Sequence, residues 1–161
     1  MNTRIITDST ADMMPEVKER VTVIPLTVHF GEEECIDGVT IDHKTFYEKL
    51  VESDVLPTTS QATPAAFIGA FEEVKQAGES AVVITLASKL SGTYQSAMIA
   101  AEEYENIYIV DSESAAVGSG ILVELALRLS DQGLGAREIA ERLEEEKKKI
   151  VIVALVDTLE Y

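Results

Sequence analysis

The chain has 161 residues, of which 46% are hydrophobic, and its 13 basic and 29 acidic residues give a net charge of −16. This length and apolar fraction predict one globular domain with a sizeable core rather than a disordered chain. The negative charge excludes a basic nucleic-acid-binding surface and disfavours contact with anionic membranes. We therefore expect no nucleic acid partner and no stable membrane insertion.

The cysteine content and the N-terminus further limit the class of protein. Cys35 is the only cysteine, which excludes a disulfide framework and a CxxC metal site. Its acidic neighbours disfavour a thiolate, so we do not expect a nucleophile there. No apolar stretch follows a basic start, and no segment is apolar for long enough to span a bilayer. These features predict a cytoplasmic protein.

Strand and helix patterns alternate along the first half of the chain. The predicted elements are a strand at residues 4–7, a hydroxyl-capped helix at 10–20, a strand at 21–30, a hairpin or loop at 31–40, and a helix at 42–53 capped by Asp42. Pro25 interrupts the alternating pattern of the second strand. Because proline cannot donate to a strand ladder, this position favours an edge strand or a bulge.

The second half continues the alternation. The predicted elements are a loop at 54–62, a helix begun by Thr63 and Pro64, a strand at 82–86, helices at 93–104, 114–131 and 136–149, a strand at 107–110, and a buried parallel strand at 150–156. Lysines 147–149 suit the last turn of a helix, where they can pair with acids four residues earlier. The pattern predicts an α/β fold: a doubly wound, mostly parallel sheet with helices on both faces.

Three of the predicted strands lead into hydroxyl residues that open a helix. These segments are Ile5–Thr10, Val82–Thr93 and Ile107–Ser112. In an open α/β sheet the carboxyl ends of the strands share one edge, where ligands bind. The repetition therefore predicts one site rich in uncharged hydrogen-bond donors. Asp8 and Asp111, at equivalent strand ends, are expected to cap helices or hold the loops.

Two segments supply the candidate donors. Ser91 can cap the following helix, while Gly92 permits close approach of a ligand and the first-turn amides can bind an anion, although an ordinary helix cap explains the same residues. The stretch from Thr58 to Gln61 can equally be a polar turn. The candidate ligand-binding residues are Thr59, Ser60, Gln61, Ser91, Gly92 and Thr93.

Gly118 and Gly120 lie inside an otherwise strongly helical stretch. Two interior glycines cost a helix about 2 kcal/mol relative to alanine. This cost predicts that another helix or the apolar chain of a ligand approaches closely. In the second case Gly118, Gly120 and Ile121 line an acyl-chain pocket.

Catalytic motifs are poorly represented. The chain has no GxSxG elbow and no phosphate-binding loop, and we expect no metal site. His29 and His43 are expected to be structural or exposed, since neither has an evident orienting partner. Two alternatives remain: a small serine hydrolase or transferase using Ser60 or Ser91, and a binding domain for a phosphorylated metabolite at the helix terminus.

Five motifs in order resemble one family. They are Thr7–Thr10, Pro57–Gln61, Leu90–Ala97, Asp111–Ser112 and Val156–Tyr161. Together they look like the DegV family, the fatty-acid-binding subunits of bacterial fatty acid kinase. The resemblance covers residues 1–161 and matches only the N-terminal α/β lipid-binding domain of that family, whose second domain is absent from this chain.

The resemblance implies a carrier rather than an enzyme. It implies that a long-chain fatty acid binds as the ligand, without a cofactor, and that Thr59, Ser60 and Ser91 hold its carboxylate. A separate ATP-dependent fatty acid kinase subunit would then convert the presented carboxylate to an acyl phosphate for phospholipid metabolism. No catalytic residue is expected in this chain.

Overall fold

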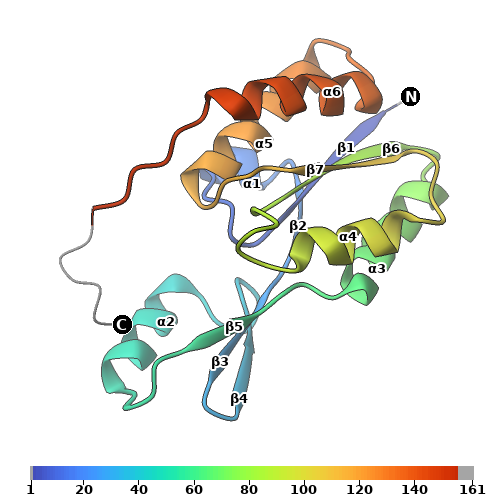
Figure 1. Ribbon diagram of the computed structural model, residues 1–161. Coiled ribbons are helices and arrows are strands. Elements are labelled where there is room, and N and C mark those ends of the chain that lie inside the picture. The colour runs from blue at the N-terminus through green and yellow to red at the C-terminus, as the bar shows by residue number, and fades with distance from the viewer. Residues whose placement is uncertain (1, 156–161) are drawn as a thin grey trace.

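The computed structural model describes residues 2–155 and contains a four-stranded parallel sheet and a smaller antiparallel one (Figure 1). The parallel sheet has the order β2-β1-β6-β7. Its strands are β1 (Thr3–Asp8), β2 (Thr22–Ile24), β6 (Ser80–Thr85) and β7 (Ile107–Asp111). Residues 5–8 of β1 and all of β6 are buried, as expected for a parallel sheet that is covered on both faces.

Two pairs of helices cover the parallel sheet (Figure 1). Helices α3 (Pro64–Gln76) and α4 (Thr93–Ala101) share a core with Ile6 and Val83, and α5 (Val117–Asp131) and α6 (Ala136–Glu146) share one with Ile5 and Val82. Because side chains alternate along a strand, neighbouring residues of β1 and β6 enter opposite cores. The predicted doubly wound fold is confirmed.

The smaller sheet has the antiparallel order β4-β3-β5. Its strands are β3 (Thr27–Phe30), β4 (Glu33–Ile36) and β5 (Thr58–Ser60), and α2 (His43–Glu52) lies beside it. The predicted hairpin is confirmed, and so is the Asp42 cap, which accepts a hydrogen bond from Thr45 N–H at 2.7 Å. The predicted loop at 54–62 is wrong at β5, whose polar residues pair with β3.

The predicted strand at 21–30 is two strands that belong to different sheets. The chain leaves β2 at Ile24 and enters β3 at Thr27, with Pro25 between them. Proline has no N–H, so the ladder ends there. As predicted, β2 is an edge strand of the parallel sheet.

The predicted helix at 10–20 is reduced to α1 (Pro15–Lys18). Thr10 does not cap it, because its hydroxyl donates to the Asp8 carboxylate at 2.6 Å. The segment before α1 instead runs along the start of α5, where Asp12 N–H donates to Ala116 O at 3.1 Å. A tertiary contact therefore replaces the first turns of the expected helix.

The predicted helix at 114–131 begins three residues late, because Glu113 and Ala116 have φ values of 52° and 48°. The predicted helix at 136–149 ends at Glu146 and continues as the 3-10 turn η1 (Lys147–Lys149). Each of these three lysines pairs with a glutamate three residues earlier, rather than four.

The predicted buried strand at 150–156 is wrong for the described residues 150–155, and residue 156 lies outside them. This segment pairs with no described strand, and Val151, Val153 and Leu155 are 82%, 88% and 97% exposed. The end of α6 explains this, because Lys147 reaches Asp111 O at the carboxyl end of β7. A parallel strand must start at the opposite, amino edge of the sheet, so the chain emerges at the wrong edge and extends away (Figure 1).

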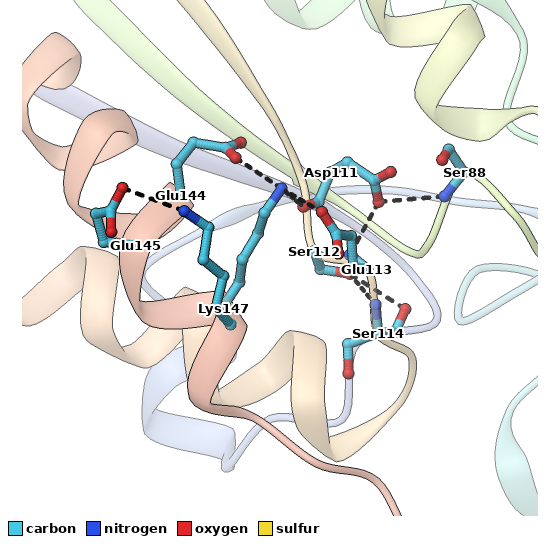
Figure 2. A network of polar contacts seen from close by, with 9 residues as sticks. Ser88, Asp111, Ser112, Glu113, Ser114, Glu144, Glu145 and Lys147 are labelled. Carbon is cyan, nitrogen blue, oxygen red and sulfur yellow. Dashed lines mark hydrogen bonds and ion pairs between the residues drawn. The ribbon is translucent and has the colours of Figure 1, made fainter.

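Lys147 anchors the loop that follows β7 (Figure 2). Its ammonium donates to Asp111 O at 2.9 Å and pairs with Glu113 at 3.0 Å and Glu144 at 2.7 Å, with only 6% of the side chain exposed. Burial lowers the pKa of Lys147, but hydrogen bonds and charge attraction from Glu144 and Glu113 outweigh burial, so the pKa lies above its ordinary 10.5. Glu113, one of its two carboxylate partners, has a left-handed backbone conformation with a φ of 52°.

Protein atoms fill the space beside the two glycines of α5. A Cβ at Gly120 would overlap the backbone carbonyl of Asp12, and a Cβ at Gly118 would meet the side chains of Ser114 and Ile152. The glycines therefore permit a close approach, as predicted. The approaching groups are loop and C-terminal residues of this chain, rather than another helix.

We expect Lys147→Met to lower the free energy of unfolding by about 1–2 kcal/mol, because two partly exposed carboxylates and a carbonyl lose their cation. The matched change Lys148→Met removes an exposed pair and should alter it by less than about 0.5 kcal/mol. Since folding raises the Lys147 pKa, the stabilisation is present below pH 10.5 and is lost as pH rises through the raised value. Urea unfolding at pH 7 and above pH 10.5 measures the loss of stability and its pH dependence. Equal stability of the Lys147→Met and Lys148→Met variants would contradict a stabilising role of Lys147.

We expect Gly120→Ala to destabilise the protein by about 1–3 kcal/mol, because the backbone carbonyl of Asp12 cannot rotate away as a side chain can. Gly69 is the control: it lies inside α3, and no atom lies within 4 Å of the place that a Cβ would take there. Gly69→Ala should stabilise the protein by about 0.5–1 kcal/mol. Urea unfolding of both variants decides the point, and a Gly120→Ala protein as stable as the parent would contradict this packing.

Candidate functional site

The two segments that carry the candidate donors lie in contact. Ala62 N–H donates to Thr93 Oγ1 at 3.3 Å, and Gln61 Nε2 donates to Ser96 Oγ at 3.0 Å. The Gln61 carboxamide also covers Gly92, where a Cβ would overlap Oε1. Residues that are about 30 positions apart in the sequence therefore form one surface at the carboxyl edge of the parallel sheet.

Ser91 lies just before α4 and is partly buried. Its Oγ accepts from Thr93 N–H at 3.2 Å and lies 2.9 Å from Thr93 Oγ1. The N-cap position itself is Gly92, so Ser91 satisfies a first-turn amide from one residue earlier. Thr93 is fully buried, and its hydroxyl oxygen accepts the hydrogen bond from Ala62 N–H that joins the two segments. Ser91 is therefore the less buried of the two hydroxyl residues.

Thr59 and Ser60 occupy opposite faces of the smaller sheet. Thr59 pairs with Val28, whose side chain is buried, and Ser60 pairs with Thr27. Alternation along β3 places Thr27 and His29 on the same face, and the contact between His29 and Ser60 agrees with this. One small head group can therefore contact only one of these two side chains.

His29 contacts the Ser60 hydroxyl, a pairing that the sequence patterns do not predict. Nε2 lies 2.7 Å from Ser60 Oγ, and Nδ1 lies 3.8 Å from Glu34 Oε1. No partner of His29 was evident from the sequence, and the structure places Ser60 beside it. The contact depends on β5 pairing with β3, and the only sequence signal for that pairing is the β propensity of the two threonines before Ser60.

Asp8 and Asp111 hold the loops at the carboxyl edge, as expected. Asp8 accepts from Leu86 N–H at 2.7 Å and from Thr10 N–H at 3.0 Å, which ties the end of β1 to the loop after β6. Asp111 accepts from Ser88 N–H at 3.1 Å (Figure 2). Burial raises the pKa of Asp8, against the opposing effect of its hydrogen bonds. These carboxylates support the surface that carries Ser91.

The residues predicted to contact an acyl chain are only partly accessible. Gly118 and Gly120 are buried, whereas Ile121 is 46% exposed. Ile121 lines a pocket of about 310 Å³, together with Asp12, Met13, Met14, Val17, Val117, Gly120 and Glu124. Protein atoms occupy the spaces beside both glycines, so Ile121 and Val117 provide the open apolar surface of α5.

The described part of the chain shows neither a metal cluster nor a membrane span. Across residues 2–155, no three or more His, Cys, Asp or Glu side chains are grouped to hold a metal ion. Among the same residues, no helix has both the length and the apolar character needed to cross a bilayer. The candidate site consists of uncharged hydroxyls, an amide and backbone groups.

Solved structures of similar chains share this fold. DegV from Bacillus subtilis, a fatty acid binding protein, superposes with a TM-score of 0.84 and 35% identity over 92% of this chain and 54% of that one. The Streptococcus pneumoniae Fatty Acid Kinase (Fak) B3 protein, loaded with linoleic acid, gives 0.78 and 25% over 92% of this chain and 55% of that one.

Sequence comparison gives the same relationship. A DegV domain-containing protein from Clostridium perfringens is 34% identical over 161 residues, which cover 98% of this chain and 58% of the relative. The chain thus spans a little over half the length of the relatives it matches. The family model described as "Uncharacterised protein, DegV family" matches residues 2–161. From this match and these identities, the chain belongs to the DegV family.

Proposed function

We propose that this chain binds a long-chain fatty acid, with the carboxylate held by the hydroxyls of Ser60 and Ser91. The observation that carries the proposal is the contact of Gln61 and Ala62 with Gly92 and Thr93, which brings the two hydroxyl-bearing segments together. The fatty acid bound by the solved relatives supports the choice of ligand. DegV proteins from Thermus thermophilus and Bacillus subtilis bind fatty acids, which supports a carrier rather than an enzyme.

The chain then presents the carboxylate to a separate ATP-dependent fatty acid kinase subunit, which forms the acyl phosphate. The Fak B3 relative supports this partner. On this proposal, residues 1–161 correspond to the N-terminal lipid-binding domain of the longer relatives. Uncharged donors suit the task, because a bidentate arginine would hold the carboxylate more firmly and oppose its transfer.

Binding energy on this proposal comes mainly from the acyl tail. Each buried methylene contributes about 0.8 kcal/mol, so ten of them outweigh the head-group contacts. Val117 and Ile121 are exposed apolar side chains of α5 that line the pocket containing Met13 and Met14. We place the tail over these side chains, rather than in the filled spaces beside Gly118 and Gly120.

The pair formed by Ser60 and His29 has the spacing of a nucleophile and its base, as the alternative serine hydrolase requires. The carboxylate that would orient the histidine is poorly placed, since Glu34 Oε1 lies 3.8 Å from Nδ1 and the Glu34 side chain is 71% exposed. A base oriented through solvent lacks the fixed geometry of a catalytic triad. Fatty acid binding by the solved relatives therefore favours the carrier.

We expect Ser60→Ala to weaken linoleate binding by about tenfold or more, because a hydrogen bond to a charged group is lost. Ser53→Ala is the matched control, since the Ser53 hydroxyl bonds only to Val55 in an exposed loop after α2. Titration of the 161-residue chain with linoleate measures the affinity, and unfolding curves verify that both variants are folded. Equal affinities of the two variants would place the head group elsewhere.

Native mass spectrometry of the gently purified chain tests the ligand class directly. A bound mass in the fatty-acid range supports the carrier, whereas a bound sugar phosphate supports the alternative metabolite site and contradicts the proposal. Incubation with a serine-reactive phosphonate addresses the hydrolase alternative. Stable labelling of Ser60 or Ser91 would count against a carrier, and we expect none.

A further inference from the structure

A short chain of hydrogen bonds connects the two hydroxyl-bearing segments through the side chain of Thr93. Ala62 N–H donates to Thr93 Oγ1 at 3.3 Å, and Thr93 Oγ1 lies 2.9 Å from Ser91 Oγ. The backbone N–H of Thr93 also donates to Ser91 Oγ, at 3.2 Å. Thr93 is 0% exposed, whereas Ser91 is only partly buried. Thr93 therefore joins the segment that carries Ser60 to the hydroxyl of Ser91.

The hydrogen bond between the two hydroxyls can run in either direction, and the burial of Thr93 decides between them. A hydroxyl group has one proton to donate and two lone pairs that accept. If Ser91 donated to Thr93, the Thr93 oxygen would accept from both Ala62 and Ser91, and its own proton would need another acceptor. Among residues 2–155, the Thr93 hydroxyl forms hydrogen bonds with no group other than Ala62 N–H and Ser91 Oγ. A buried donor without an acceptor is costly, so Thr93 donates and Ser91 accepts.

This direction determines what Ser91 can offer a ligand. The Ser91 oxygen accepts from the hydroxyl and from the backbone N–H of Thr93, so both of its lone pairs are used. The Ser91 proton then has no acceptor among the residues that the structure describes, which leaves it for a ligand or for solvent. Ser91 is thus a hydrogen-bond donor only. An ionised carboxylate can only accept hydrogen bonds, so it is the complementary head group.

The two hydrogen bonds from Thr93 also fix where the Ser91 oxygen lies. A serine side chain rotates among three staggered positions when nothing holds it. Contacts of 2.9 Å and 3.2 Å with two atoms of Thr93 select one of these positions before any ligand arrives. Ordering of the Ser91 side chain therefore costs little on binding. Because hydrogen bonds in series polarise one another, donation by Thr93 also makes Ser91 a stronger donor.

We propose that Thr93 is a positioning residue for the head-group site: its hydroxyl donates to Ser91 Oγ and so directs the Ser91 proton to the ligand carboxylate. This inference rests on the proposed function. Thr93 belongs to the site without contacting the ligand, because none of its surface is exposed. It acts through Ser91, and it holds the segment of Ser60 in place through Ala62.

The first test measures the direction of the hydrogen bond in the ligand-free 161-residue chain. Exchange NMR follows the hydroxyl protons of Thr93 and Ser91, with the exposed Thr58 as the reference. We expect the Thr93 proton to exchange with water about tenfold or more slowly than that of Thr58, and the Ser91 proton to exchange fast. Addition of linoleate should slow the Ser91 proton. A slowly exchanging Ser91 proton in the ligand-free chain would reverse the direction and overturn the inference.

The second test measures the linoleate affinity of variants by calorimetric titration. Thr93→Val removes the hydroxyl and should weaken binding about three- to tenfold, whereas Thr93→Ser keeps the hydroxyl and should stay within about twofold of the parent. Because Thr93 acts through Ser91, Thr93→Val should cost less than about twofold in a chain that already carries Ser91→Ala. Unfolding curves verify that each variant is folded.

Ser96→Ala separates positioning from a structural role. Ser96 is buried on the same helix, and its hydroxyl accepts from Gln61 of the other segment at 3.0 Å without a hydrogen bond to Ser91. A loss of affinity that comes from loosening the two segments should therefore be the same in the parent chain and in the Ser91→Ala chain. If Thr93→Val also weakens binding equally in both chains, Thr93 has only a structural role and the inference fails.

The outcomes distinguish this inference from the proposed function. A slowly exchanging Ser91 proton, or equal losses in the two chains, would overturn the role of Thr93 and leave fatty acid binding intact. A Ser91→Ala chain that binds linoleate as tightly as the parent would place the head group away from Ser91 and overturn the inference as well. If the parent chain binds no linoleate, the proposed function and the role of Thr93 fail together.

Discussion

The approach of Gln61 to Gly92 is the constraint on which the arrangement of the candidate site depends. The carboxamide occupies the space that any other residue at position 92 would fill with its Cβ. It also bonds to Ser96, so the chain that connects the smaller sheet to α3 is attached to the first turns of α4. Without this attachment, the face that carries Ser60 would be free to move away from Ser91.

Much of the architecture could be predicted from local sequence signals. Asp42 and Thr63 cap the expected helices, and Pro64 occupies the first turn where its missing N–H has no consequence. The apolar residues at the centres of β1 and β6 indicated a sheet covered on both faces. In these cases the determining interactions lie within one or two turns of the residue concerned, and a single sequence contains them.

The structure differs from the sequence-based predictions where a residue far away in the sequence determines the local conformation. Thr10 bonds to Asp8 instead of starting a helix, and the polar strand β5 forms only because β3 offers it an edge. The apolar run at 150–155 has the composition of a buried strand. It follows Lys147, which contacts Asp111 O at the carboxyl edge of the sheet, whereas a further parallel strand would have to start at the amino edge. The candidate hydroxyl segments were identifiable from the sequence, but the histidine facing Ser60 was not, since that contact crosses two strands.

The exposed run after α6 has a consequence for the colloidal behaviour of the protein. Residues 151–155 are uncharged and β-prone and lack proline, which is the composition that stacks into cross-β assemblies. A net charge of −16 keeps copies of the chain apart through mutual repulsion. The screening length shrinks from about 30 Å at 0.01 M salt to about 3 Å at 1 M. At low ionic strength this repulsion therefore keeps the molecules apart. At high ionic strength it is screened, and the exposed apolar residues 151–155 of different molecules can associate.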